Sequence, residues 1–540
     1  MNGHAASKHI RSYEENMALL EEKSVSDVEN GAGRADFDHR FSEPTRLMAT
    51  TAQSIVSGVR STHPRTFLRR AGLFLIPSFL SRDPRHSTAG ERVGPTAYLD
   101  GMRGLAALFV FFCHYSYTCF VIAEGWGYKD TNWYLLKLPF IRLFYQGPPM
   151  VTVFFVVSGY ALSLKPLKLM RSRNYGSFTT TMASFVFRRG MRLFLPTAIS
   201  TMMVVIIVRL GLYEWTREFS ADKTYMRNVQ EHHYARLPTL GAQLEDWVKS
   251  MYNFIHIWDW ETFGGSTPID LHLWTIPVEF RCSMFLFLAL IGTARLRTAV
   301  RFLVVILLMV FTWRSTKWEM LLFFSGMLLA ELDIIRGAHG SSGSGAAATT
   351  TAPSSGNGST LPPPSPKPPS PKPARTSRNK ALWLGLSVLS LYLMSQPDDG
   401  GAETPGWVIL TRMIPHFWPQ DALYRYWQSV GAVIFVLAVG HSPLTWQRFF
   451  NSALIQYLGK ISYSMYLMHG PVLHTFGYAI ERACWGITGV QTDFQYYAGF
   501  ALSSIFIVPL VICVSDVFWR GVDAPVVRFA KAVEGWCVVE

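Results

Sequence analysis

The sequence predicts an all-α, polytopic membrane protein of about ten transmembrane helices with both termini in the cytosol. Of its 540 residues, 49% are hydrophobic and only 16% are charged, and the mean hydropathy is +0.17. The 17 Trp and 22 Tyr residues suit two aromatic belts, one at each membrane interface. Long apolar segments, separated by loops whose charges are unevenly distributed, indicate the same class.

Ten apolar segments are long enough, or nearly long enough, to cross a bilayer, which takes about 20 residues of upright helix. Several are shorter than that, so we expect some helices to be tilted or to be extended by flanking aromatic residues. In chain order the segments are 98–122, 150–166, 192–211, 274–293, 299–313, 317–334, 381–396, 427–441, 453–475 and 496–518.

The charges of the loops predict the orientation of these segments. The loop at 165–192 holds seven basic residues and no acid, and the segment at 334–380 holds six basic residues and no acid. The long loop at 210–273 instead holds nine acids and five basic residues. Because Lys and Arg are retained on the cytosolic side, the first two loops and both termini are predicted to be cytosolic. The loop at 210–273 then lies outside the cell or in a lumen.

The membrane domain is predicted to span 96–525 and to follow a long tail. Residues 1–95 are polar and of mixed charge, so we expect a partly disordered cytosolic segment. An interfacial helix is expected within it at 66–82, because the apolar run there is too short to span and follows Arg69 and Arg70.

A linker rich in Gly, Ser and Pro interrupts the membrane domain at 338–380. Eight prolines fall within 361–373, and such a composition cannot build a packed core. A flexible cytosolic spacer is favoured over a PxxP ligand for a binding domain. Residues 526–540 are predicted to form a short cytosolic tail.

Composition and motifs disfavour several classes of function. The net charge of +13 is typical of many nucleic-acid-binding proteins, but basic cytosolic loops explain it more economically. The six cysteines are scattered and form no CxxC pair, so neither a disulfide framework nor a metal site is expected. The sequence contains no P-loop, no Gly-x-Ser-x-Gly elbow and no HExxH motif.

Arg103 and His114 lie eleven residues apart within the first apolar segment. Eleven residues are about three helical turns, so both side chains fall on one helix face, roughly 16 Å apart along the axis. Ionisable groups are costly inside a membrane and usually mark a polar path or a site. A neighbouring helix often satisfies an isolated histidine, but the shared face favours a functional interpretation. In this functional interpretation, neutral His114 takes a proton from a hydroxyl group.

Glu279 lies near the start of the fourth apolar segment. Its carboxylate would be stabilised there by the positive end of a helix, which is one sufficient explanation. The predicted topology places Glu279 and His114 in the same, outer half of the membrane. We therefore expect Glu279 to orient His114 or to receive its proton.

Arg188, Arg189 and Arg192 form a cluster at the cytosolic mouth of the third segment. Positive-inside anchoring alone would account for their charge. The density of the cluster also suits a phosphate-rich ligand, since guanidinium groups bind phosphates in a bidentate fashion.

Three further polar residues are candidates for lining a cavity in the membrane domain. His469 and Tyr466 lie near the outer end of the ninth segment, and His469 alternatively caps a helix turn before Pro471. Ser158 is the most prominent serine, although a Ser158-Gly159 pair more often permits close packing of helices.

Five segments, taken in order, resemble the acyltransferase-3 family of membrane O-acyltransferases, which acetylate surface sugars in bacteria and also occur in eukaryotes. Each segment is weak evidence alone, whereas the ordered set covers about 96–525 and is specific. The segments are Leu99-Asp-Gly-Met-Arg103-Gly-Leu with His114 downstream, Val153-Phe-Phe-Val-Val-Ser-Gly-Tyr, Arg189-Gly-Met-Arg192-Leu before Pro196, Leu273-Trp-Thr-Ile-Pro-Val-Glu279-Phe, and Gly459-Lys-Ile-Ser-Tyr-Ser-Met-Tyr-Leu-Met-His469-Gly-Pro471.

The resemblance implies a multi-pass enzyme of the plasma membrane or an endomembrane. It would move an acyl group, usually acetyl, from cytosolic acyl-CoA to a hydroxyl of a carbohydrate, a glycolipid or a small secondary metabolite. Acyl-CoA is then a donor substrate, and no cofactor stays bound. The family's Arg-x10-His pattern falls on Arg103 and His114, its Arg-x-x-Arg pattern on Arg189 and Arg192, and its glutamate on Glu279.

The chain departs from the family pattern in its long loop at 210–273 and its proline-rich insertion at 340–375. Nothing in the sequence resembles the secreted esterase-like domain that bacterial members often append. We expect the reaction to finish within the membrane domain or with a separate partner.

Two other classes of function are compatible with the same residues. A transporter or lipid flippase would use the intramembrane charges as a substrate or proton path, although no internal repeat supports it. A non-catalytic membrane protein would bind acyl-CoA or lipid without turnover. Consumption of acyl-CoA distinguishes the enzyme from both.

Overall fold

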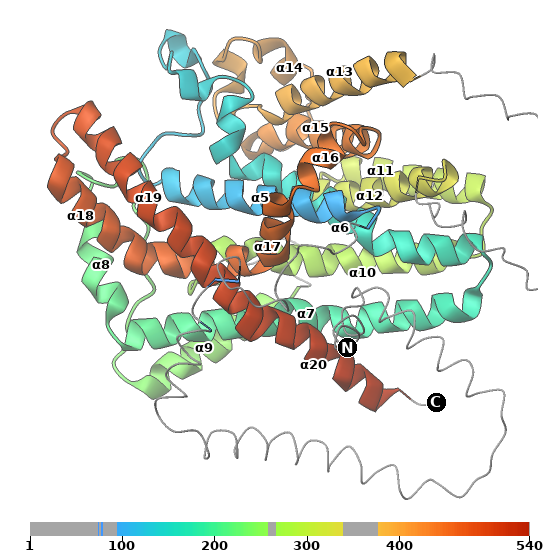
Figure 1. Cartoon of the computed structure of the whole chain (residues 1–540), viewed down its shortest axis with the longest axis horizontal. Helices are drawn as coiled ribbons and strands as arrows, with labels where there is room; N and C mark the ends of the chain where they lie inside the picture. The colour runs from blue at the N-terminus through green and yellow to red at the C-terminus, as the bar shows by residue number, and fades with distance from the viewer. Residues whose placement is uncertain (1–73, 75–76, 79–93, 258–265, 339–375, 539–540) are drawn as a thin grey trace, which may run out of the picture.

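The computed structural model describes residues 74, 77–78, 94–257, 266–338 and 376–538 (Figure 1). These residues form helices joined by turns, with isolated β-bridges and no extended strand among them. The predicted all-α class is therefore confirmed. The interfacial helix predicted at 66–82 and most of the linker at 338–380 lie outside the described residues.

Each of the ten predicted apolar segments contains a helix. These helices are α5 (Ala97–Ser116), α6 (Gly147–Arg171), α7 (Tyr175–Arg209), α10 (Thr275–Thr293), α11 (Thr298–Arg314), α12 (Trp318–Ile335), α13 (Thr376–Met394), α15 (Tyr424–Gly440), α17 (Ala453–Val472) and α19 (Asp493–Phe518).

Shorter elements join them. They are η2 (Tyr128–Asp130), η3 (Leu135–Lys137), η4 (Ile141–Tyr145), α8 (Leu212–Ala221), α9 (Leu240–Ile255), η5 (Leu271–Trp274), η7 (Gly401–Glu403), α14 (Val408–Arg412), η8 (Gln420–Ala422), α16 (Trp446–Phe450), η9 (Leu473–Gly477), α18 (Tyr478–Thr488), η10 (Trp519–Asp523) and α20 (Ala524–Cys537).

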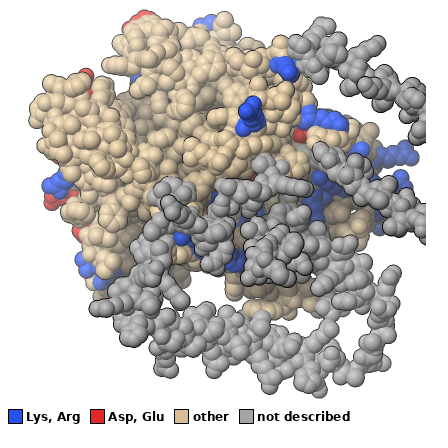
Figure 2. All heavy atoms as spheres, in the orientation of Figure 1, with Lys and Arg blue, Asp and Glu red and all other residues tan. Residues whose placement is uncertain are grey.

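Four stretches of the described chain are long and apolar enough to cross a membrane: Gly147–Arg171, Tyr175–Arg209, Leu271–Thr293 and Asp493–Cys537. Figure 2 shows that most of the visible face carries no charged side chain, as expected of helices that meet lipid. These observations support a membrane protein, while the number of ten crossings remains a prediction.

The basic segment at 165–192 is mostly helical, which differs from the predicted loop. Helix α6 runs on to Arg171 and α7 begins at Tyr175, so Arg188, Arg189 and Arg192 lie well inside α7. Two local features reverse the chain over three residues. Arg173 adopts a left-handed conformation with φ 57°, and the Asn174 side chain accepts a hydrogen bond from the Ser177 backbone N–H at 3.1 Å. The arginine cluster therefore sits on a rigid helix.

The C-terminal segment, predicted as a short cytosolic tail at 526–540, is mostly helical. Residues 524–537 form helix α20, which packs against α7. The chain enters α20 directly from α19 through the π-helical turn η10. A similar π-helical turn, η9, carries the chain from α17 past Pro471 into α18. Such turns re-route backbone hydrogen bonds without ending the helix, so His469 does not cap a helix end.

Glycines bring the backbones of α5 and α17 into direct contact. A Cβ at Gly104 would lie 2.3 Å from the backbone nitrogen of Gly459, and one at Gly459 would lie 2.6 Å from the Asp100 carbonyl oxygen. Ten residues further along each helix, the rings of His114 and His469 face each other. The two helices therefore run side by side in the same direction and hold these histidines at one level.

A second glycine contact joins α6 to α12. A Cβ at Gly159 would lie 2.2 Å from the Phe323 carbonyl oxygen, and one at Gly326 would lie 2.2 Å from that of Val156. The close packing expected of the Ser158-Gly159 pair is thus confirmed for Gly159. It places Ser158, the preceding residue, at an inward-facing level of α6.

The two ends of the bundle carry different loops. In Figure 1 the helices α6, α7, α10 and α12 run roughly horizontally, with α8 at their left-hand ends and the start of α13 at the right. Helix α8 belongs to the acid-rich loop at 210–273, and α13 follows the basic linker. The arrangement therefore separates the two loops as the charge pattern requires.

The glycine contact between α5 and α17 yields a test of the packing. Gly104→Ala should lower the free energy of unfolding by about 1–3 kcal/mol, because the methyl group forces two backbones apart. Gly292→Ala is the matched control, since a Cβ there meets no atom within 4 Å and alanine favours a helix. Thermal unfolding in detergent would measure both. Equal midpoints for the two variants would contradict the proposed packing.

Candidate active site

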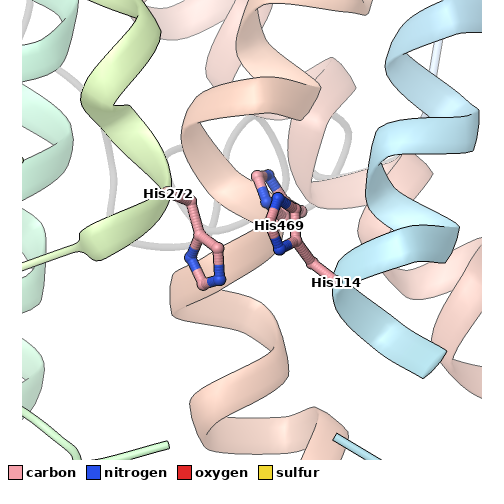
Figure 3. A group of neighbouring side chains, drawn as sticks. All are labelled: His114, His272 and His469. Carbon is pink, nitrogen blue, oxygen red and sulfur yellow. The ribbon is translucent and has the colours of Figure 1, made fainter. Parts of the chain in front are cut away.

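Three histidines from three elements gather at one point of the bundle (Figure 3). The ring centroid of His114 on α5 lies 4.2 Å from that of His272 in η5 and 5.2 Å from that of His469 on α17. The rings of His272 and His469 are 5.1 Å apart. Predicted site residues His114 and His469 thus meet, and His272 joins them.

Two buried acids hold His272. Its Nδ1 lies 2.9 Å from Asp270 Oδ1, and its Nε2 lies 3.2 Å from Glu231 Oε1. Glu231 also contacts His474 Nε2 at 2.7 Å. Burial alone would raise the pKa of the Glu231 carboxyl, but His272 and His474 outweigh that effect and hold the pKa well below its usual range. Glu231 is therefore a carboxylate at neutral pH.

The other two histidines keep a nitrogen free. His469 Nδ1 faces the Met465 carbonyl oxygen at 3.1 Å, which leaves its Nε2 as the open position. His469 Nε2 and His114 Nδ1 are both buried and have no hydrogen-bond partner among the described residues. Buried polar atoms without partners are unusual and often mark a place where substrate binds or a proton moves.

Tyr466 fixes the start of α10. Its hydroxyl donates to the backbone carbonyl of His272 and accepts a 2.7 Å hydrogen bond from the Thr275 hydroxyl. Tyr466 thus positions the backbone of His272. It does not line the large cavity near the start of α5.

A cavity of about 830 Å³ lies at the other end of α5. It brings together five of the predicted residues, from α5, α6, α7 and α10, and adds basic groups of α17 and α20. Its polar lining includes Asp100, Arg103, Ser158, Arg189, Arg192, Glu279, Gln456, Lys460, Tyr463, Asp523 and Arg528.

Glu279 belongs to this cavity. Its Oε1 accepts a 2.8 Å hydrogen bond from Arg189 Nη2 and a 3.1 Å hydrogen bond from the Ser158 hydroxyl. Within the described structure it makes no hydrogen bond or ion pair with His114. The expected contact of Glu279 with His114 is therefore not found. Because α10 begins at Thr275, Glu279 lies a full turn inside the helix, away from η5.

Arg188 also lies elsewhere than predicted. Its side chain forms a 3.0 Å ion pair with Glu534 of α20 and does not line the cavity. Neighbouring positions on α7 point in different directions, so only Arg189 and Arg192 face inward. The arginine cluster therefore divides into two lining residues and one that anchors α20.

The three histidines are the group of described residues whose donor atoms could hold a metal ion. Those atoms all lie within 4.8 Å of one another. Ligand atoms around a tetrahedral zinc ion, at bonds of about 2.0–2.1 Å, stand roughly 3.3 Å apart. Both nitrogens of His272 already face carboxylates, so the geometry favours proton exchange over metal binding.

Sequence reasoning missed His272, Asp270, Glu231 and His474. The Asp-x-His spacing of Asp270 and His272, just before an apolar segment, is a local signal that could have been used. Glu231 offers no such signal, because the folding of the loop at 210–273 alone brings it to the cluster.

Comparison with known proteins agrees with this geometry. The model of the acyltransferase-3 family, described as an acyltransferase domain, matches residues 96–520. The O-acetyltransferase PaAT-1 of Phomopsis amygdali is 31% identical over 507 residues, which cover 90% of this chain and 94% of that protein. The chain belongs to the acyltransferase-3 family.

Two further acyltransferases are similar to this chain. Acyltransferase R4 of Phoma sp. and acyltransferase clz18 of Cochliobolus lunatus are each 24% identical to it, over 80% of this chain and 94% of their own lengths. No solved structure matches the chain. As a member of the acyltransferase-3 family the protein is a membrane-bound acyltransferase, and the transporter and scaffold alternatives are set aside.

Proposed function

We propose that the enzyme moves an acyl group, most simply acetyl, from acyl-CoA held in the large cavity to an acceptor hydroxyl at the histidine cluster. One observation carries this proposal. Arg103 and His114 project from the same helix, and the first lines the cavity while the second lies in the cluster. A donor site and an acceptor site thus share one element.

The charges of the cavity suit the phosphates of CoA. Its basic residues outnumber its acids, and Arg192 has no ion pair or hydrogen bond within the described structure. Arg189 is already shared with Glu279, so Arg192 is the stronger phosphate ligand. The volume falls within the range of about 300–1,000 Å³ that is typical of ligand sites.

The distance between the two sites suits the pantetheine arm of CoA. Arg103 and His114 lie roughly 16 Å apart along α5. Phosphates bound at Arg103 and Arg192 would leave the thioester free to extend along α5 toward His114. The long arm of CoA would thereby bridge the cavity and the cluster.

His114 acts as the general base in this proposal. It takes the proton of the acceptor hydroxyl while the oxygen attacks the carbonyl carbon of the thioester. The carbon–sulfur bond then breaks, and the CoA thiolate takes the proton back from His114. Direct transfer is the simplest course because no activated nucleophile is evident near the cluster.

The acceptor carries a hydroxyl group, as in a carbohydrate, a glycolipid or a small secondary metabolite. The similarity to PaAT-1, an O-acetyltransferase, supports an acetyl donor and an oxygen acceptor. We further propose ten membrane crossings with cytosolic termini, in the plasma membrane or an endomembrane. In that topology the cavity opens to cytosolic acyl-CoA, and the cluster lies toward the opposite face.

The topology predicts opposite accessibility for two exposed residues. Ser172, between α6 and α7, should be cytosolic, and Asp222, after α8, should face the other side. Single cysteines at these positions, in a background without the six native cysteines, should react with an impermeant thiol reagent from opposite sides of sealed vesicles. Labelling of both from one side would contradict the orientation and separate the cavity from cytosolic acyl-CoA.

The cavity predicts a division within the arginine cluster. Arg192→Ala should raise the KM for acyl-CoA roughly tenfold and leave kcat within about threefold, because a phosphate far from the reacting carbon contributes mainly uniform binding. Arg188→Ala is the matched control, since that side chain pairs with Glu534 outside the cavity. Steady-state kinetics and competition by free CoA would measure both. Equal effects of the two substitutions would reduce the cluster to a topological anchor.

The proposed role of His114 as general base predicts that its substitution has the largest effect on turnover. His114→Ala should lower turnover about 10²–10⁴-fold, because it removes the proton acceptor. The purified variant should still insert into membranes and unfold at a similar temperature, since His114 makes no hydrogen bond with other described residues. Release of CoA from acyl-CoA in membranes that contain the acceptor would report turnover. A folded variant with more than a tenth of wild-type turnover would rule out His114 as the base.

A further inference from the structure

Three buried groups near His114 have no role in the proposed mechanism. Asp270, His272 and Glu231 have exposed fractions of 7%, 5% and 9%. We propose that Asp270 and Glu231 keep a proton on His272, and that charged His272 keeps the neighbouring His114 unprotonated and ready to act as base. The proposal rests on the proposed function of His114 and adds positioning residues that sequence reasoning did not identify.

The two acids beside His272 assign its charge: Asp270 forms a hydrogen bond with Nδ1, and Glu231 forms an ion pair at Nε2, which has no hydrogen bond. Its Nδ1 lies 2.9 Å from Asp270 Oδ1, and its Nε2 lies 3.2 Å from Glu231 Oε1. A neutral imidazole has one N–H and one lone pair, so one of its nitrogens would face a carboxylate with a lone pair. A protonated imidazole instead donates Nδ1–H to Asp270 and carries a positive charge that Glu231 attracts. The doubly protonated form is therefore the one that fits.

Both acids are held in place by other contacts. Asp270 Oδ1 also accepts the His272 backbone N–H at 3.0 Å. Glu231 Oε2 contacts His474 Nε2 at 2.7 Å and accepts a 3.2 Å hydrogen bond from the Tyr478 hydroxyl. Neither carboxylate can turn away from His272 without losing these bonds.

Helix α17 closes over the pair of Asp270 and His272. A Cβ at Gly470 would lie 2.9 Å from His272 Nδ1 and 3.0 Å from Asp270 Oδ2. Only glycine permits this approach of the α17 backbone, and the side chains of His272 and Asp270 are only 5% and 4% exposed. Charges interact strongly where water is excluded, so the acids act on His272 with little screening.

The proton on His272 determines the state of His114. The two ring centroids are 4.2 Å apart, and two positive imidazoles at that distance repel each other strongly. The other titratable groups facing the two rings are Glu231, Asp270, His469, His474 and Tyr117. Because both acids contact His272 and neither contacts His114, the proton stays on His272. His114 is then neutral, with a buried nitrogen that has no hydrogen-bond partner among the described residues.

The protonation states can be measured without an acceptor. Exchange of the imidazole carbon-2 hydrogen, followed by mass spectrometry, reports the charge of each histidine in the full-length protein in detergent. At pH 6.5 we expect His272 to be charged and His114 to be neutral. In the double variant Asp270→Asn, Glu231→Gln, His272 should lose its proton. The pH below which His114 becomes charged should then rise by about 1–3 units.

A matched control and an activity readout complete the experiment. Glu245→Gln changes an exposed carboxylate of the same loop that pairs, among the described residues, with Lys249, and it should leave both histidines as in the wild type. If the double variant folds poorly, the single Asp270→Asn variant should shift His114 in the same direction by a smaller amount. In the variants the acid limb of the pH–rate profile should move to higher pH.

Three results would overturn the proposal. One is a charged His114 in the wild type at pH 6.5, and another is an unchanged His114 in the double variant. The third is a stoichiometric metal ion in the purified protein that is lost on His272→Gln, because the cluster would then be a metal site. Loss of turnover in His114→Ala tests the proposed base separately, so either claim can fail while the other stands.

Discussion

Gly104 on α5 and Gly459 on α17 let two helix backbones touch, and the polar groups of the site are placed relative to that contact. From this contact to that of His114 with His469, the two helices run together in one direction. Near the two glycines, Asp100 and Arg103 of α5 lie beside the cavity. Ten residues beyond Gly104 and Gly459, His114 lies beside His469. A larger residue at either glycine would separate the helices and with them both halves of the site.

The cavity and the histidine cluster differ in the arrangement of their charged groups. In the cavity, basic side chains are partly balanced by Glu279, Asp100 and Asp523, so a net positive charge remains for a polyanionic ligand. In the cluster, two carboxylates contact His272 and leave His114 and His469 without a direct acid partner. An acyl donor with phosphates at one end and a thioester at the other matches this order. The chemistry then takes place away from the charges that bind the donor.

Much of this arrangement follows from local sequence. The spacing of Arg103 and His114 placed both on one face of one helix, and apolar segments located the ten helices. Charge counts could not show that α7 begins as early as Tyr175, because 175–187 contains no charged residue and its Ser, Thr and Gly are also common in loops. They also could not show that Arg188 turns toward Glu534, since that partner lies on a helix far along the chain. Predicting the role of Glu279 required a tertiary contact with Arg189 that no local pattern contains.

The acids beside His272 illustrate the same limit. Glu231 reaches the cluster only because α8 packs against η9 and α18, and the loop after it brings Glu231 to His474. The most direct measurement of the account is a cryo-EM structure with a thioether analogue of acetyl-CoA, which cannot transfer its acyl group. We predict phosphate density within hydrogen-bond reach of Arg103 and Arg192, and the sulfur beside His114. Density for the whole analogue within the cavity, with the sulfur far from His114, would contradict the claim that one donor bridges both sites.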